Sequence, residues 1–416
     1  MCSGRPDNAG CRQGDRGKPT LRPPRRRRYP AYVPRAAKQA RELPGLLERI
    51  ATRVAFLLVG LAASAWAPLV PLARARLGLD DGGLGALLLC MGLGSVVAMP
   101  FSGGLAARFG CRKMILGSGL LSCASLPVMA IAPTAAVLAC ALFLFGVGIG
   151  CTDVVMNIQA VIVERASGRP MMSGFHGLYS VGGIGGAGVV TGLMAWGVPP
   201  LPAVLAVVLP AGLLLVGFAK GLLPYASDEE TPVFAFPKGR VLLIGMLCFI
   251  LFLAEGSVLD WSGVLLNSVR GLAERHAGIA YVTFSITMTV GRLSGDAVVR
   301  ALQPRRILLV GGLCAAAGFV LAATVPAWQA TVLGFAIVGV GAANVVPVLF
   351  SAAGRQTSMP SNLAVAAVTT MGYAGILAGP PLIGFVARAS SLPVALVTVA
   401  AMLVAVALNS RRATAA

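Results

Sequence analysis

Of the 416 residues, 57% are hydrophobic and only 12% are charged, with a mean hydropathy of +0.83. Soluble domains average about 45–50% apolar and about 25% charged residues, so this composition excludes an ordinary soluble enzyme or binding domain and indicates a chain that lies in a lipid bilayer. The formal charge of +19 would suit a nucleic-acid-binding protein, but its distribution along the chain argues against one.

The basic charge is concentrated near the N-terminus. Residues 1–53 hold 14 of the 34 Lys and Arg, including the run from Arg25 to Arg28, and Pro and Gly are frequent there. No aromatic platform or folded module for nucleic acid accompanies this charge, and no apolar stretch precedes residue 54 as a signal peptide would require. We therefore predict that residues 1–49 are a disordered, basic cytoplasmic tail that touches anionic lipid at most, and that the protein has no nucleic-acid partner.

Apolar runs follow from about residue 50 onward, separated by short loops rich in Arg, Gly or Pro. Helices that cross a bilayer each need about 17–25 mostly apolar residues, whereas the strands of a membrane barrel would show alternating segments of about ten residues. The runs have the first pattern, so we predict an all-α membrane protein with twelve transmembrane helices. The predicted helices cover residues 50–72, 84–106, 113–132, 134–163, 173–197, 200–222, 240–268, 277–301, 306–325, 329–353, 361–387 and 391–408.

Positive charge orients these helices, because loops rich in Lys and Arg stay in the cytoplasm. Twelve Lys and Arg lie in or beside the loops after the even-numbered helices, and five lie in the loops after the odd-numbered helices. Another 14 lie at or before Arg53, in the first turn of the first helix, and Arg411 and Arg412 follow the last helix. We therefore predict that both termini, including a short tail at 409–416, are cytoplasmic.

The two halves of the helical region resemble each other. Sliding the sequence on itself by 191 positions places Asp153 over Asn344 within a glycine-rich stretch, and sliding it by 192 places Arg108 over Arg300. Parallel repeats of this kind are typical of transporters built from two halves around a site near the middle of the membrane. We therefore predict two pseudo-symmetric six-helix halves. They are residues 50–222 and 240–408, joined by a polar cytoplasmic linker at 223–239.

The loop between the second and third predicted helices, GGLAARFGCRK, resembles the signature loop of the major facilitator superfamily. It matches at Gly103, Arg108 and Gly110 but has Ala107 where the signature has Asp. In that family this loop and its second copy join the cytoplasmic ends of helices through charge and helix-dipole contacts, and their basic residues also set the orientation. The resemblance assigns this role to Gly103, Arg108, Gly110, Lys113, Arg300 and Arg305.

The stretches DVVMNIQAVIVE, GFHGLYSVGGIGGA and EGSVLDWS are similar to a bacterial branch of that family near the fucose-permease-like sugar:proton symporters. The resemblance implies a multi-pass protein of the bacterial cytoplasmic (inner) membrane that acts as a monomer on a small-molecule solute, contacts membrane lipid and is not an enzyme. It also implies a proton as coupling ion and no cofactor. The nine cysteines show no CxxC or Cys/His spacing, so no metal is expected.

The fourth predicted helix carries an acid in an apolar stretch, GIGCTDVVMNIQ. Gly146, Gly150, Asp153 and Asn157 share one helical stripe, so small residues open the face on which the polar groups stand. An ionised carboxylate at bilayer depth costs at least about 2.5–3.5 kcal/mol, so Asp153 should face the inside of the bundle. We predict that Asp153 and Asn157 bind the solute together with Asn344, the repeat counterpart of Asp153; the alternative is a hydrogen bond that only packs helices.

The seventh predicted helix contains ILFLAEGSVLDWSG, which places Glu255 near the middle of the membrane. Burial favours the neutral form of a carboxyl group, so such a residue can carry a proton and release it when the cavity opens to water. We predict Glu255 as the proton-coupling residue, with Asp153 as the second candidate. Trp261 either stacks on a sugar-like solute or anchors the helix at the membrane interface. Tyr373 and Trp261 complete the predicted substrate-binding set.

Three further polar residues lie in predicted helices. Arg292 and Asp296 are four residues apart, which favours a structural ion pair within one helix, or a gate if the partners exchange. A stable pair between Arg292 and Glu255 of the preceding helix would instead hold that carboxylate ionised and argue against proton transfer by Glu255. His176 opens the fifth predicted helix and can relay a proton, but a hydrogen-bonded loop histidine is the simpler interpretation.

A secondary transporter is the function class that these features favour. The sequence has no GxxxxGK[ST] phosphate loop and no G-x-S-G or H-E-x-x-H motif, which leaves a membrane enzyme or a receptor as remote alternatives. Many proton-driven exporters of the superfamily carry an arginine motif in helix 4 and a proline-containing motif in helix 5, and this chain has neither. We therefore predict proton-coupled symport of a small polar, sugar-like solute by alternating access, with drug or metabolite export as the alternative.

Overall fold

The computed structural model describes residues 44–227, 231–273 and 276–415. Within these ranges all regular secondary structure is helical. Most of the predicted tail, 1–49, lies outside the described residues, but its last part is helical because α1 begins at Leu46. The Glu48 carboxylate accepts a hydrogen bond from the Gly45 amide at 2.7 Å, which caps the helix earlier than hydropathy alone suggests.

Seven α-helices come from the first part of the chain. They are α1 (Leu46–Ala65), α2 (Val70–Leu77), α3 (Asp81–Phe109), α4 (Cys111–Ile131), α5 (Ala135–Ser167), α6 (Met172–Ala195) and α7 (Pro200–Gly217). Side-chain caps start two of them: Asp80 accepts a hydrogen bond from the Gly83 amide, and Thr134 accepts one from the Val137 amide. Gly168, with a φ of 61°, ends α5 in the left-handed conformation that glycine adopts readily.

Seven more follow the linker. They are α8 (Gly239–Val264), α9 (Ile279–Thr324), α10 (Trp328–Ala342), α11 (Val345–Arg355), α12 (Ser361–Ala389), α13 (Leu392–Leu408) and α14 (Ser410–Thr414). The longest, α9, turns sharply at Gln303, whose φ of 68° is a left-handed conformation that costs a residue with a side chain about 1–3 kcal/mol. Pro304 then begins the second arm of α9, where the missing amide hydrogen is not needed.

These helices supply twelve membrane spans. Ten helical segments in the described ranges are long and apolar enough to cross a membrane, and α13 is a shorter apolar helix of 17 residues. One of the ten is α9, whose two arms count as separate spans, whereas α1 with α2 and α10 with α11 each count as one. The predictions of an all-α membrane fold and of twelve transmembrane helices are therefore confirmed.

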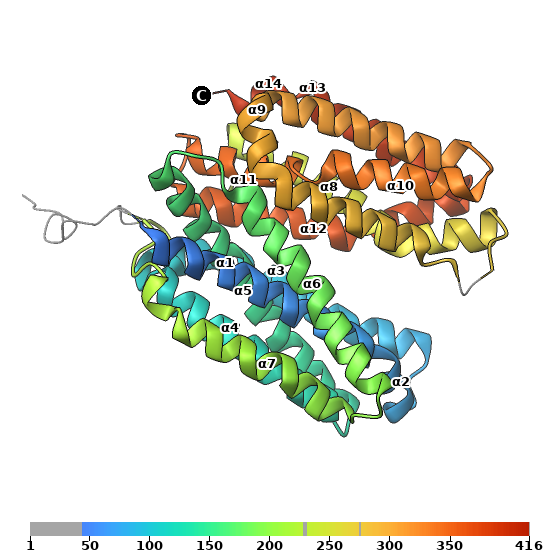
Figure 1. Cartoon of the computed structure of the whole chain (residues 1–416), viewed down its shortest axis with the longest axis horizontal. Helices are drawn as coiled ribbons and strands as arrows, with labels where there is room; N and C mark the ends of the chain where they lie inside the picture. Colours follow the sequence, from blue (N-terminus) through green and yellow to red (C-terminus); the bar gives the residue numbers. More distant parts are fainter. Residues whose placement is uncertain (1–43, 228–230, 274–275, 416) are drawn as a thin grey trace, which may run out of the picture. The chain divides into compact units, whose positions relative to one another are not determined.

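The spans pack as two similar groups (Figure 1). In the first group α1 packs on α6, and α5 packs on α3 and α4. In the second group α8 packs on α12, and α9 packs on α10 and α13. The groups meet where α3 contacts α12, α6 contacts α9, and α5 contacts α11 and α12. A site shared by both halves must therefore lie between these helices.

Close helix contacts at glycine show how the two halves correspond. A Cβ atom on Gly146 would lie 2.0 Å from the carbonyl oxygen of Met91, and one on Gly339 would lie 2.6 Å from that of Phe284. Gly339 lies 193 positions after Gly146, and its contact Phe284 lies 193 positions after Met91. The contacts that Gly148 and Gly341 make with the next helix are related by the same offset.

This offset corrects the predicted counterpart of Asp153. With a shift of 193, Asp153 corresponds to Val346 and Asn157 to Phe350, whereas the shift of 191 had paired Asp153 with Asn344. The error arose because the glycines in both stretches recur every second residue. Sliding one half by two positions therefore still matches glycine with glycine.

A second repeated feature lies at the ends of α4 and α9. Arg76 donates hydrogen bonds to the main-chain carbonyls of Met129 and Ala130. Arg270 does the same for Ala322 and Ala323, at 3.0 and 2.8 Å. Arginine at a helix C-terminus satisfies free carbonyls and complements the helix dipole. Arg76 and Arg270, two of the five basic residues in the loops after the odd-numbered predicted helices, thus have a structural role in the described chain.

The chain between α7 and α8 lies at the end of the bundle where α3 ends and α12 begins, which we call the linker end. Asn362 in α12 donates to the Gly103 carbonyl at 2.9 Å and to the Thr231 hydroxyl at 3.1 Å, so one side chain ties α12 to α3 and to the linker. Gly103 has no room for a Cβ, which would lie 2.6 Å from the Asn362 carbonyl oxygen. Gly110, with a φ of 84°, lies directly against the Pro224 carbonyl.

Of the basic residues assigned to the signature loop and its second copy, Arg108, Lys113 and Arg305 contribute less than predicted. The Arg108 guanidinium lies 5.4 Å over the ring of its own neighbour Phe109. Lys113 and Arg305 make no hydrogen bond or ion pair with described residues. The predicted charge contacts are thus not formed at these positions. Ala107 stands where the signature has an acid. Instead, α3 packs closely on α12 at Gly103 and on the linker at Gly110, and Arg112 donates to the Leu222 and Lys220 carbonyls, both at 2.8 Å.

Candidate substrate-binding site

A cavity of about 290 Å³ lies between the two halves, bordered by α1, α3, α5, α6, α8, α9, α11 and α12. This is the size of a small-ligand pocket. Its polar lining residues are Ser95, Asp153, Asn157, His176, Tyr179, Glu255, Arg292 and Tyr373. Aromatic rings of Phe145, Phe252 and Phe350 form much of the remaining wall. Five of the predicted site residues are therefore brought together: Asp153, Asn157, Glu255, Arg292 and Tyr373.

Asp153 and Asn157 face this cavity from α5 and are 8% and 1% exposed. The Asn157 amide nitrogen donates to the main-chain carbonyl of Asp153 at 2.9 Å, and its side-chain oxygen has no partner in the described chain. The Asp153 carboxyl group makes no hydrogen bond or ion pair with any described residue. The hydrogen bond to another helix, which the helix-packing alternative requires, is thus not formed by either side chain in this structure. Both acceptors are available to a solute.

Glu255 and Arg292 form an ion pair between α8 and α9. One guanidinium nitrogen of Arg292 lies 3.1 and 3.2 Å from the two Glu255 carboxylate oxygens. The other terminal nitrogen donates to the Ser180 hydroxyl of α6 at 3.1 Å. Arg292 is 7% exposed, so it depends on these partners for its stability. Its side chain therefore links the proposed coupling acid to the opposite half of the protein.

The predicted ion pair between Arg292 and Asp296 is absent, which corrects that interpretation. Asp296 instead accepts a hydrogen bond from the Gly174 amide at the start of α6, at 3.0 Å. The spacing of four residues permits an ion pair between Arg292 and Asp296, but each side chain contacts a neighbouring helix instead. Sequence spacing within one helix carries no information about such partners.

His176 and Tyr179 are the cavity residues that the sequence interpretation underestimated. His176 lies within α6, not in a loop, and its Nδ1 is hydrogen-bonded to the Met172 carbonyl at 3.0 Å. Its ring lies between Phe56 and Phe350, at centroid distances of 5.1 and 5.6 Å, so it contacts both halves. The segment GFHGLYS already held the signal, because a polar residue at each helical turn marks one face.

Two predicted substrate-binding residues lie outside the cavity lining. The amide of Asn344 donates to the Gly291 carbonyl at 3.0 Å, which packs the junction of α10 and α11 against α9. The Trp261 ring lies in van der Waals reach of Gly384 in α12, and its indole nitrogen is buried without a partner. Both side chains serve helix packing in this structure. Within the described ranges no cluster of His, Cys, Asp or Glu could hold a metal ion.

Twelve apolar spans in two similar halves, with a small polar-lined cavity between them, define a membrane transport protein. The family model of the Major Facilitator Superfamily matches residues 53–359, and the chain belongs to that family. It is accordingly a transporter and not an enzyme. The predicted family resemblance is confirmed.

Curated relatives agree with this assignment. The chain is 53% identical over 372 residues to an uncharacterized MFS-type transporter of Yersinia pestis, which covers 89% of this chain and 97% of the relative. It is 32% identical over 363 residues to the membrane protein MosC of Rhizobium meliloti, covering 85% and 87% of the two chains.

Solved structures share the fold. The fucose:proton symporter FucP of E. coli matches with a TM-score of 0.74 at 14% identity, over 89% of this chain and 99% of FucP. The proton:xylose symporter XylE matches with a TM-score of 0.71 at 13% identity, over 88% and 95%.

Proposed function

We propose that the protein is a proton-coupled symporter that moves a small polar, sugar-like solute across the bacterial inner membrane by alternating access. The observation that carries this proposal is the cavity between the halves, where unpartnered acceptors on Asp153 and Asn157 lie near the Glu255–Arg292 ion pair. The named substrates of FucP and XylE support the same solute class.

Solute binding would use the α5 side of the cavity. The Asp153 carboxylate accepts hydrogen bonds from solute hydroxyls, and the Asn157 side-chain oxygen adds a second acceptor. Tyr373 and Phe252, with ring centroids 6.2 Å apart, provide an apolar aromatic surface for the face of a sugar ring. A sugar-like solute matches both parts of the cavity, because its hydroxyl groups form polar edges and its ring has apolar faces.

Proton coupling would use the ion pair. In the described conformation Arg292 compensates the charge of Glu255, and it also holds Ser180 in the other half. A proton on Glu255 removes the charge that Arg292 neutralises, so the pair weakens and Arg292 becomes free to change partners. Glu255 protonation and the contact between the halves are thereby linked.

Alternating access would begin from a conformation closed at the linker end. There Glu164 of α5 lies 3.6 Å from Arg355 of α11, and a Cβ on Gly354 would lie 2.3 Å from the Val161 side chain. If the linker is cytoplasmic, the cavity opens to the outside in this state. Loosening of the linker-end contacts then releases the solute inward.

Uptake by proteoliposomes tests the proposal. A metabolite screen of cells that lack or overexpress the protein first selects candidate solutes, among them pentoses, hexoses and polyols. We expect at least one to accumulate against its gradient when the outside is acidic, and a protonophore to abolish the accumulation. Depletion of the solute from overexpressing cells would instead support export. If none of the screened solutes moves in either direction, the result would contradict a transport function.

Cysteine labelling tests the proposed orientation. In a background without the nine native cysteines, we expect Pro133→Cys to react with an impermeant maleimide in intact cells. Ser227→Cys, at the linker end, should react only after the membrane is opened. This follows from the excess of basic residues at the linker end. The reverse labelling pattern would show that the protein has the opposite orientation in the membrane.

A further inference from the structure

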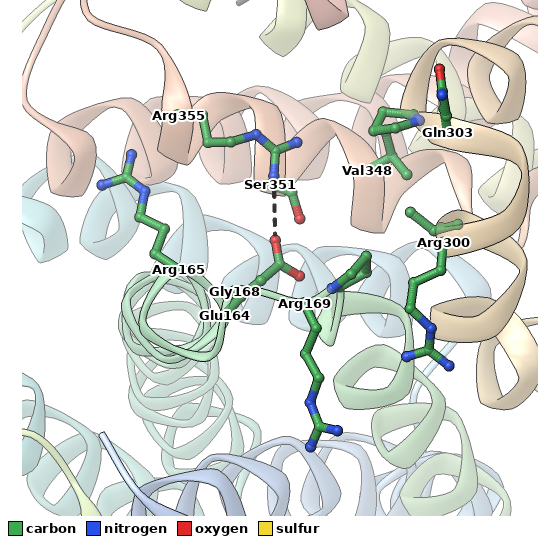
Figure 2. Close-up of a pocket in the computed structure, with 12 residues that line it drawn as sticks. Glu164, Arg165, Gly168, Arg169, Arg300, Gln303, Val348, Ser351 and Arg355 are labelled. Atoms are coloured by element: carbon green, nitrogen blue, oxygen red, sulfur yellow. Dashed lines mark ion pairs between the residues drawn. The ribbon is translucent and has the colours of Figure 1, made fainter. Parts of the chain in front are cut away.

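A second cavity, of about 520 Å³, lies at the linker end between α5, α9 and α11. Four of its lining residues are arginines, two from each half of the protein: Arg165, Arg169, Arg300 and Arg355. Figure 2 shows Arg355 opposite Glu164, while Arg169 and Arg300 extend in the same direction in this view from either side of the pocket. We call this cavity the arginine pocket.

The acid in the arginine pocket does not balance its charge. One carboxylate oxygen of Glu164 accepts hydrogen bonds from the Met171 and Met172 amides, both at 2.9 Å. The other lies 3.6 Å from Arg355, too far for a hydrogen bond. The side chains of Arg169 and Arg300 are exposed and make no hydrogen bond or ion pair with described residues, so their donors are open to a ligand. Four exposed arginine side chains therefore surround the pocket. The two nearby carboxylates, Glu164 in the pocket and Asp296 beside Arg300, both accept hydrogen bonds from main-chain amides.

Arginines with free donors from several directions are suited to one class of ligand. A guanidinium presents a planar fork of N–H groups that matches the oxygens of a phosphate group, and charge-assisted bonds of this kind are strong. The neighbouring backbone is strained, since Gln303 in the pocket lining has a φ of 68°. Strained residues cluster at ligand sites, where the surrounding structure holds them.

We propose that the arginine pocket binds a phosphate-bearing anion, either a lipid headgroup or a soluble phosphate. The anion bridges Arg169 of the first half and Arg300 of the second and so stabilises closure of the linker end. Basic pockets at the ends of transmembrane helices are positioned to receive anionic headgroups, and a free phosphate offers the same oxygens. The site is separate from the central cavity, so its test does not depend on the transported solute.

Calorimetric titration of the purified full-length protein in detergent tests this proposal with two probes, inorganic phosphate and the short-chain lipid dihexanoyl phosphatidylglycerol. The double variant Arg169→Gln/Arg300→Gln should lose at least about ten-fold in affinity, because each guanidinium supplies a charge-assisted bond. The matched control Arg411→Gln/Arg412→Gln removes the same charge from exposed residues of α14 outside the pocket and should change the affinity by less than about two-fold.

Hydrogen exchange on the same samples locates the ligand. Bound anion should slow amide exchange around residues 165–172 and 299–306, on both sides of the pocket. Binding of phosphatidylglycerol alone identifies a lipid site, whereas binding of inorganic phosphate identifies a soluble ligand; both support the proposal. Binding of neither probe, equal loss in the α14 control, or protection confined to other segments overturns it.

Discussion

Glu255→Gln is expected to abolish solute accumulation driven by a pH gradient while leaving solute exchange across the membrane intact. Gln resembles the protonated acid, so the conformational change that the proton normally permits remains possible without it. Its side-chain oxygen can still accept a hydrogen bond from Arg292, which now lies 3.1 Å from the carboxylate. Counterflow and acid-driven uptake, measured on the same reconstituted protein, should therefore separate by at least about ten-fold, since a proton that cannot bind contributes no driving force.

Asp260→Asn is the matched control, because Asp260 lies in the same helix but is exposed and does not line the cavity. It should keep both activities. Acid-driven accumulation that persists in Glu255→Gln with unchanged pH dependence would remove Glu255 from the coupling mechanism, and Asp153 would become the coupling candidate. Loss of counterflow as well would indicate that the charge of Glu255 is needed for the alternation itself.

The fold could be predicted from the sequence because hydropathy acts locally. Each apolar run specifies its own helix, and the few errors are at ends, such as the start of α1, where a cap and not hydropathy decides. Asp153 and Asn157 were placed correctly on the cavity side for a related reason. The burial cost of a polar group in a helix requires it to face other helices, whichever they are.

Contacts between helices could not be predicted in this way. Arg292 has one possible partner in its own helix and another in α8, and only the packing of α8 against α9 selects Glu255. Asn344 was misplaced for a different reason, since glycines at every second position make the repeat match at more than one register.

The arginine pocket shows the same limit. Its arginines come from α5 and the loop after it in the first half and from α9 and α11 in the second, more than a hundred residues further along the chain. In the sequence each one only adds to the charge that orients the helices. The closeness of α5, α9 and α11 converts them into one site. Residues counted for topology can therefore also line one pocket, which composition alone does not reveal.

Asp153→Asn is expected to weaken solute binding by about 10- to 150-fold, which is the range for losing a hydrogen bond to a charged acceptor. The substitution keeps the size of the side chain and removes its charge. The thermal unfolding midpoint should stay unchanged, because the carboxyl group makes no hydrogen bond or ion pair with described residues. Binding of the solute identified by the uptake screen, measured by calorimetry beside a thermal melt, gives both quantities.

Thr152→Val, one residue earlier in α5, should show the opposite result. The Thr152 hydroxyl is hydrogen-bonded to Ser118 of α4 at 2.7 Å and does not line the cavity. Its loss leaves Ser118 without that partner and should lower stability by about 1 kcal/mol while solute affinity is retained. If Asp153→Asn behaves like Thr152→Val, with reduced stability and unchanged affinity, then Asp153 serves helix packing and the solute is bound elsewhere in the cavity.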